Sequence, residues 1–423
     1  MTEVTEQLEP TVGNWVVGER FWGRDKELEL FIEDLDAGSH LLLVAQRRMG
    51  KTSLMREASC RISGRYICLN VDLQSAHSAA DAIAELSAAT YEHQSLWSKT
   101  KEIFSNILKS TAGQIDSLQL ANLKVTLRSG LTVDNWQEKG DRLLDCLAQS
   151  EKPVAIFLDE VPILISRLLK GEDYQITPDR RRQADAFMSW LRANGIKHQG
   201  TVRMVLTGSI GLEPILRQGG LSATVNNFQP FELGPWSPDT AQGCLQALGN
   251  HRGLTYCAGA LPDITDCLGI CIPYHIQLFF DRIRKVCHLQ DLTVVSPELV
   301  AEVYETKMLS VQGHAELSHM EERLKVVLGP TLHPLALTLL TETAVVGKLT
   351  SAATQILIQE FVVDIENGNS GDIAREILNI LEHDGYLKRY PEGYQFESKL
   401  LKDWWKARNG FHFVVASDRK GNH

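Results

Sequence analysis

Long apolar runs are missing from this sequence of 423 residues. The runs 153–158 and 161–165 fall far short of the roughly 20 residues that a membrane-spanning helix needs, and Asp159 and Glu160 separate them. The first ten residues, MTEVTEQLEP, are polar and acidic and do not have the basic start and apolar stretch of an export signal. We therefore expect a cytoplasmic protein that does not enter a membrane.

Cysteine and positive charge are also scarce. The eight cysteines are scattered, and the closest pair, Cys267 and Cys271, has no second Cys or His pair at zinc spacing. Buried thiols in a reducing compartment are the simplest interpretation. The formal net charge of −10 repels polyanions unless basic side chains gather on one face, which argues against nonspecific binding to nucleic acid.

The first half of the chain alternates compact apolar runs with helical patterns. Such runs predict strands at 40–44, 66–71, 153–158 and 203–206. Strands that alternate with helices predict an α/β fold with a parallel sheet, in which every strand ends at the same edge. The candidate chemistry, described next, falls at these strand ends.

The second half is mostly helical. Residues 240–290 predict a helical lid, and residues 335–384 predict three further helices. Two short strands around 391–393 follow, and three helices with such a hairpin predict a winged helix. We therefore divide the chain into an α/β core at 1–235, a lid at 236–325 and a winged-helix domain at 326–423.

The segment 45–52, AQRRMGKT, has the spacing of a phosphate-binding P-loop, with Ala45 where the first glycine is usual. It follows a predicted strand and opens a predicted helix, so backbone N–H groups and the helix dipole can hold a β-phosphate. Lys51 is expected to reach the β- and γ-phosphates, and the Thr52 hydroxyl to bind Mg²⁺. The predicted phosphate-binding residues are Ala45, Gln46, Arg47, Arg48, Met49, Gly50, Lys51, Thr52 and Ser53.

Two carboxylates end the predicted strand 153–158. Asp159 is expected to hold Mg²⁺ through water, and Glu160 to polarise the attacking water. The alternative is that they cap the helix that follows. The P-loop favours the catalytic interpretation.

Polar residues after the fourth strand are further candidates. Thr207 or Ser209 can hydrogen-bond the γ-phosphate or the lytic water, or either can stabilise a turn. Arg217 can sense phosphate in its own chain, act as an arginine finger in a neighbouring subunit, or lie in solvent at a helix end.

The order of these motifs resembles the archaeal-type ATPases of the STAND branch of AAA+-like proteins, which are relatives of the origin-recognition ATPases. The motifs that carry the resemblance are 23–28 (GRDKEL), 47–53 (RRMGKTS), 158–162 (LDEVP), 207–212 (TGSIGL), 231–237 (FELGPWS), 269–274 (GICIPY) and 394–405 (YQFESKLLKDWW). The likeness spans nearly the whole chain, and only residues 75–150 carry little of it.

The resemblance implies a nucleotide switch that binds ATP or ADP with Mg²⁺ between core and lid. It implies that Gly23 and Arg24 lie near the adenine and that Pro273 closes over it. The lid has no clear arginine where related proteins place a γ-phosphate sensor, and Arg282 is a stand-in. The sequence also has no N-K-x-D guanine motif, which favours adenine.

Three functions remain open. The first is a slow, regulated ATPase switch. The second is a DNA-binding ATPase that uses the winged helix on double-stranded DNA, with 373–383 as recognition helix. The third is a nucleotide-gated scaffold of a defence or mobile-element system that acts through an effector protein or its own oligomer. Residues 326–423 hold ten Lys and Arg against twelve Asp and Glu, a net charge of −2 that suits phosphate binding poorly.

Overall fold

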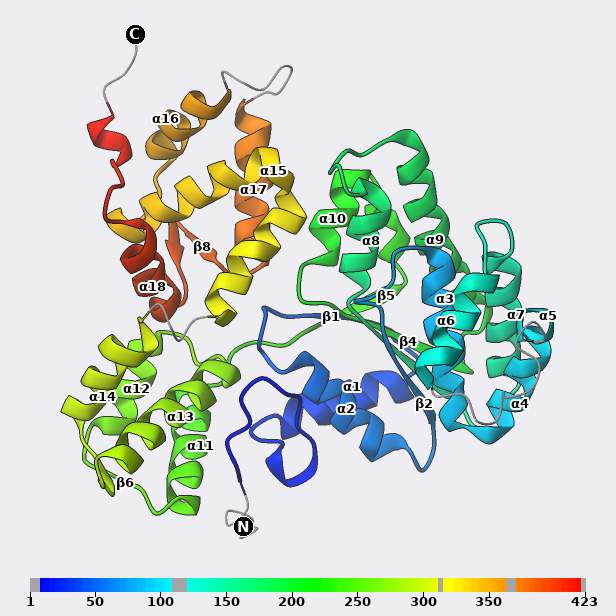
Figure 1. The fold of residues 1–423 in the computed structure, drawn as a ribbon, viewed down its shortest axis with the longest axis horizontal. Coiled ribbons are helices and arrows are strands. Elements are labelled where there is room, and N and C mark those ends of the chain that lie inside the picture. Colours follow the sequence, from blue (N-terminus) through cyan, green and yellow to red (C-terminus); the bar gives the residue numbers. More distant parts are fainter. Residues whose placement is uncertain (1–7, 109–119, 311–314, 363–369, 420–423) are drawn as a thin grey trace. The chain divides into compact units, whose positions relative to one another are not determined.

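The computed structural model describes residues 8–108, 120–310, 315–362 and 370–419 (Figure 1). The chain forms two compact units. One, here called the sheet unit, comprises Lys26–Val44 and Leu54–Glu232. The other, here called the helical unit, comprises Met1–Asp25, Ala45–Ser53 and Leu233–His423.

A five-stranded parallel sheet is the centre of the sheet unit. Its strand order is β2-β3-β4-β1-β5. The strands are β1 (His40–Val44), β2 (Ile67–Asp72), β3 (Val154–Asp159), β4 (Val202–Leu206) and β5 (Phe228–Glu232). The α/β fold and the first four strands are therefore as expected, and β5 is an addition that the sequence did not predict.

Helices cover both faces of this sheet. In Figure 1, α8, α9 and α10 lie on one side of it and α1 and α2 on the other. Buried strand residues pack between these layers, and β4 is buried along its whole length. The helices are α1 (Asp25–Asp36), α2 (Lys51–Ile62), α3 (Ala79–Ala89), α4 (Gln94–Ile103), α5 (Ser105–Leu108), α6 (Leu120–Gly130), α7 (Trp136–Ala148), α8 (Val161–Lys170), α9 (Pro178–Lys197) and α10 (Leu212–Gly219).

The first part of the helical unit contains the helices expected for residues 240–290. These are α11 (Pro238–His251), α12 (Ala260–Leu268) and α13 (Pro273–Leu289), followed by α14 (Pro297–Val303). A small parallel ribbon of β6 (Thr255–Tyr256) and β7 (Val294–Val295) joins them. Their apolar faces form one core around fully buried residues such as Phe279 and Phe280.

The last part of the helical unit has three helices and a hairpin. They are α15 (Ala315–Val346), α16 (Ser351–Val362), α17 (Ser370–His383) and the strands β8 (Leu387–Tyr390) and β9 (Gly393–Phe396). The chain then forms α18 (Lys399–Asn409), in which the indole N–H of buried Trp405 donates to Thr341 Oγ1 at 3.1 Å. The expected order of helices and strands is present.

Helix α15 contains a long apolar stretch. The stretch Met320–Val346 of α15 is long and apolar enough to cross a membrane by composition, and half of its most apolar window is buried. This stretch is two helices joined at Gly329, whose backbone is not helical (φ 71°, ψ 175°). A packed core helix of a globular protein can have the same length and composition, so the stretch is weak evidence for a membrane.

Candidate nucleotide-binding site

The loop after β1 has a backbone shape that can wrap around a phosphate. Among residues 45–52, Arg48 (φ 68°) and Gly50 (φ 93°) have positive φ. No atom lies within 4 Å of a Cβ built on Gly50, so it is the backbone angle rather than crowding that favours glycine there. Ala45 does not have a positive φ, and its methyl group is therefore compatible with the loop.

Lys51 begins α2 and its side chain lies back over the loop. The ammonium group donates to the carbonyl oxygen of Ala45 at 2.7 Å and to that of Gln46 at 3.0 Å. Lys51 is 8% exposed, and Thr52 follows it in the first turn of the helix. A lysine and a hydroxyl at a helix N-terminus are the groups that phosphate and its counter-ion need.

Arg24 fastens this loop to the chain beyond the sheet. Its guanidinium donates to the carbonyl oxygen of Gly234 at 2.6 Å and to that of Met49 at 3.3 Å, and the residue is 5% exposed. Gly23, beside it, packs against the side chain of Thr240. Both predicted residues therefore lie in the same unit as the loop, and Arg24 contacts the loop directly.

The segment before α13 is also held in this unit. The backbone N–H of Trp236 donates to the carbonyl oxygen of Cys271 at 3.0 Å, two residues before Pro273 opens the helix. The guanidinium of Arg48 lies over the ring of Tyr274, 4.7 Å from its centroid. The sequence predicted residues 269–274 and the loop as separate motifs, and the structure brings Arg48 and Tyr274 into contact.

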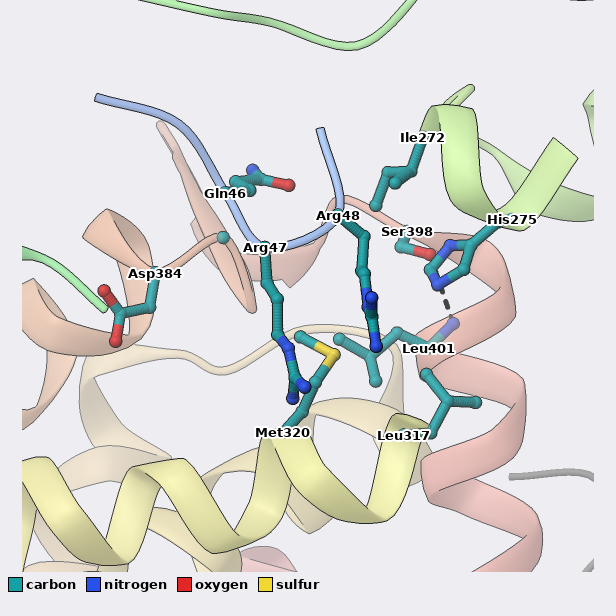
Figure 2. A pocket seen from close by; sticks show the side chains of 11 residues that line it. Gln46, Arg47, Arg48, Ile272, His275, Leu317, Met320, Asp384, Ser398 and Leu401 are labelled. Atoms are coloured by element: carbon teal, nitrogen blue, oxygen red, sulfur yellow. Dashed lines mark hydrogen bonds between the residues drawn. The ribbon is translucent and has the colours of Figure 1, made fainter. Parts of the chain in front are cut away.

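The other side chains of the loop point toward the C-terminal segments. Figure 2 shows Gln46, Arg47 and Arg48 lining a small pocket of about 20 Å³. Its other lining residues are Ile272, His275, Leu317, Met320, Asp384, Gly385, Ser398 and Leu401. The amide of Gln46 donates to Glu397 Oε2 at 3.0 Å. No motif indicated this contact, since the two residues are 351 positions apart.

The predicted carboxylates lie at the carboxyl edge of the sheet unit. Asp159 is the last residue of β3, and in the strand register it stands beside Asp72, which ends β2. Glu160 has a left-handed backbone (φ 59°), and its N–H donates to Asp159 Oδ1 at 2.9 Å. This kink turns the chain sharply from strand to helix between the two carboxylates.

Ser209 holds the carboxylate of Glu160 from the next strand end. Its backbone N–H and its hydroxyl both donate to Glu160 Oε2, at 3.0 and 2.7 Å. Thr207 instead donates its buried hydroxyl to the carbonyl oxygen of Leu43 at 3.3 Å, which ties β4 to β1. The Thr207 hydroxyl therefore binds the backbone of a neighbouring strand, while the Ser209 hydroxyl is directed at Glu160, the predicted water-activating group.

Arg217 and Arg167 differ in their surroundings. Arg217 is exposed near the end of α10. Arg167 in α8, which no motif indicated, donates to the carbonyl oxygens of Gln74 and Ala76 at 2.6 and 2.8 Å. Burial lowers the pKa of Arg167, and the nearby Glu160 carboxylate opposes this shift. Arg167 therefore lies within electrostatic range of Glu160.

Oxygen ligands are the groups available for a metal. No group of three or more His, Cys, Asp and Glu in the described ranges is arranged to hold a metal ion. Mg²⁺ keeps several waters and takes few protein ligands, so it does not need such a group. The eight cysteines are free thiols, but only Cys244, Cys271 and Cys287 are buried, while Cys60 and Cys257 are exposed, so the expectation of buried thiols is wrong for most of them.

The order of the strands in the sheet follows a known plan. β4 lies between β1, which leads into the loop, and β3, which ends in Asp159. A parallel sheet with a glycine-lysine-threonine loop between a central strand and a helix is the P-loop nucleoside triphosphatase fold.

Solved structures with this fold are similar to the chain over nearly its whole length. A Walker-type ATPase of Pyrococcus abyssi has a TM-score of 0.58 and 14% sequence identity, covering 95% of this chain and 99% of its own. The ORC2 protein of Aeropyrum pernix, solved in ADPNP–ADP complexes, has a TM-score of 0.50 and 12% identity, covering 90% and 93%. At these identities the likeness shows the fold.

No family model matches the sequence, and no curated protein matches it. The sheet order and the solved structures nevertheless confirm the expected P-loop fold. The narrower assignment to the STAND branch stays a prediction.

Proposed function

We propose that the protein binds ATP with Mg²⁺ and hydrolyses it slowly, and that its nucleotide state controls what its C-terminal region contacts. The observation that carries this proposal is the loop itself. Positive φ angles at Arg48 and Gly50 shape the backbone, and Lys51 opens a helix directly after it. Backbone N–H groups, a lysine and a helix dipole are the elements that hold a β,γ-phosphate.

The residues of the site take the following roles. Lys51 exchanges its two loop carbonyl partners for phosphate oxygens, and Thr52 and Asp159 hold Mg²⁺, which neutralises charge on the phosphates when bound. Glu160 orients the attacking water and accepts its proton, with Ser209 fixing the carboxylate. The exposed Arg217 suits a role in a neighbouring subunit better than one in its own chain.

The adenine side is proposed to lie at Gly23, Arg24 and Pro273. Arg24 joins the loop to the chain at Gly234, and the bond from Trp236 to Cys271 brings the turn before Pro273 to the same stretch. A base placed there contacts both the N-terminal segment and α13. Such an arrangement makes the position of the proposed lid depend on the nucleotide.

The C-terminal region is proposed to be a winged helix that contacts a protein partner rather than DNA. The exposed face of α17 carries Asp372 and Glu382 beside Arg375, which pairs with Asp372 at 3.0 Å. Three of the four cations of α18 are also paired: Lys399 and Lys402 with Asp403, and Arg408 with Glu321. Cations already held by carboxylates are poor phosphate ligands.

DNA binding is the second candidate function, because Lys388 and Arg389 are exposed on the hairpin. We also propose that the domain boundaries lie at residues 235 and 325 and that the protein is cytoplasmic. Its proposed role in a defence or mobile-element system would be carried out through an effector protein or a homo-oligomer. The net charge of −2 over residues 326–423 favours the protein partner.

The test is ATP hydrolysis and Mg-ATP binding by the purified protein over a series of protein concentrations. Lys51→Ala is expected to abolish binding, and Glu160→Gln is expected to keep binding and lose turnover. Turnover per chain that rises with protein concentration supports self-assembly with Arg217 acting between subunits. Hydrolysis by Glu160→Gln at the unmutated rate would show that another group activates the water.

A further inference from the structure

We propose that Glu397, at the start of the turn after the C-terminal hairpin, is a positioning residue for the phosphate-binding loop and acts through Gln46. The inference rests on the proposed nucleotide site and adds a residue to it from the far end of the chain. All of its contacts lie within the helical unit.

Gln46 connects the nucleotide lysine to Glu397. Its backbone carbonyl accepts a hydrogen bond from Lys51 Nζ at 3.0 Å, and its side-chain amide donates to Glu397 Oε2 at 3.0 Å. A hydrogen bond to a carboxylate is stronger than one between neutral groups. Glu397 therefore restrains the same residue whose carbonyl lies against Lys51.

Gly385 lies close against the side chain of Gln46. A Cβ built on Gly385, which has φ +77°, comes within 2.0 Å of Gln46 Cδ. Only a glycine allows the amide to lie there, and the positive φ adds a second reason for glycine. The small pocket in Figure 2 is lined by Gln46, Asp384 and Gly385, so this loop side chain packs against the C-terminal segment rather than extending into solvent.

Glu397 is itself fixed by the hairpin. Lys388 Nζ in β8 donates to Glu397 Oε1 at 3.0 Å, while Oε2 receives Gln46. Glu397 raises the pKa of Lys388, as expected for a cation beside a carboxylate. Each oxygen of one carboxylate thus has its own donor, one from the hairpin and one from the loop. This fixes the orientation in which Glu397 meets Gln46.

The consequence for nucleotide binding is preorganisation. A loop that must present several N–H groups to one phosphate binds more tightly when its side chains are already held. Loss of the Gln46–Glu397 bond is expected to weaken Mg-ATP binding about tenfold, the effect of one charge-assisted hydrogen bond.

The test is a double-mutant cycle on the dissociation constant of Mg-ATP, measured with the full chain. Gln46→Ala and Glu397→Ala are each expected to weaken binding about tenfold, and the double variant to be no weaker than either. Glu397→Gln keeps an acceptor for Gln46 and is expected to restore affinity to within about twofold. Non-additivity and this rescue separate positioning from general loss of structure.

Glu392→Ala is the matched control. Glu392 lies in the turn of the same hairpin and pairs with Lys348 at 2.9 Å, so its loss removes a comparable ion pair away from the loop. It is expected to bind Mg-ATP as the unmutated protein does. Circular dichroism and thermal unfolding of each variant establish that it is folded.

Three outcomes overturn the inference. The first is unmutated affinity in Glu397→Ala, and the second is additive effects of Gln46→Ala and Glu397→Ala. The third is an equal loss in Glu392→Ala, which would mean that the hairpin acts by general stability. These leave the proposed nucleotide site intact if the unmutated protein binds Mg-ATP. Absence of binding by the unmutated protein overturns the proposed function and this inference together.

Discussion

Glu160 and Ser209 act together in the proposed activation of the attacking water. Asp159-Glu160 at a strand end suggested a water-activating carboxylate, and the sequence left Ser209 between phosphate sensor and turn former. In the structure both donors of Ser209 are directed at Glu160 Oε2. The sequence could not indicate this, because the contact depends on the turn after β4 and on the left-handed backbone of Glu160.

Ser209→Ala is predicted to slow hydrolysis about tenfold while leaving the dissociation constant of Mg-ATP unchanged. The substitution removes the hydroxyl donor and leaves the backbone N–H, so Glu160 is less well oriented. Single-turnover hydrolysis and nucleotide titration measure the two quantities. Ser209→Thr keeps a hydroxyl and is the control. Weaker binding at an unchanged rate would instead make Ser209 a phosphate sensor.

At the scale of elements, apolar runs predicted the strands that are buried on both faces. β1, β3 and β4 are almost entirely buried and mostly apolar because helices cover both sides of the sheet, although His40 lies in β1 and Arg203 in β4. β5 escaped prediction because only Phe228 and Phe231 of its five residues are buried and because it contains Pro230. Local pattern therefore predicted the three central strands and the edge strand β2, and missed the opposite edge strand β5.

Gln46 was predicted as a phosphate-binding residue, but its contact with Glu397 was not predicted. A motif read along the chain shows which backbone can bind phosphate, as for residues 45–52. It does not show which distant segment packs on that loop. The structure supplies Arg24, Tyr274 and Glu397 as contacts of the loop, each from a different part of the chain.

His40 in β1 is predicted to make the free energy of unfolding depend on pH. It is 6% exposed, its Nδ1 accepts from the N–H of Met204 at 3.1 Å, and its Nε2 lies 2.9 Å from the carbonyl oxygen of Gly195. Burial lowers the pKa of His40 below 6.5, and Arg203 lowers it further, against the opposing bond to Gly195. The buried ring is therefore neutral, with its proton on Nε2.

The direction of this pH dependence follows from which state, folded or unfolded, binds the proton. As pH falls through 6.5 the unfolded chain protonates this histidine and the folded chain does not, so stability decreases as pH falls below about 6.5. Urea unfolding at pH 7.5 and 5.5 measures the change. His40→Gln is expected to reduce the slope, with a remainder from His198, whose pKa burial also lowers. An identical slope in His40→Gln would contradict the assignment.

At the scale of the whole molecule, charge bears on the choice of partner. The net charge is −10, and the C-terminal region does not offset it. Its basic residues are mostly held in ion pairs, so few counter-ions would be released on contact with a duplex. The net negative charge already disfavours binding to DNA, and the ion pairs formed by the basic residues in the structure disfavour it further.

We therefore predict that double-stranded DNA neither binds detectably at about 0.15 M salt nor changes ATP turnover. Fluorescence anisotropy with a labelled duplex over a salt series, together with turnover with and without the duplex, measures both. Tight binding that weakens with salt, and that Arg389→Ala removes while Arg375→Ala does not, would make the hairpin a DNA-contacting element and the protein-partner proposal wrong. Because Lys388 on the same strand holds Glu397, a duplex on that hairpin would also alter nucleotide affinity, which gives the DNA hypothesis a readout of its own.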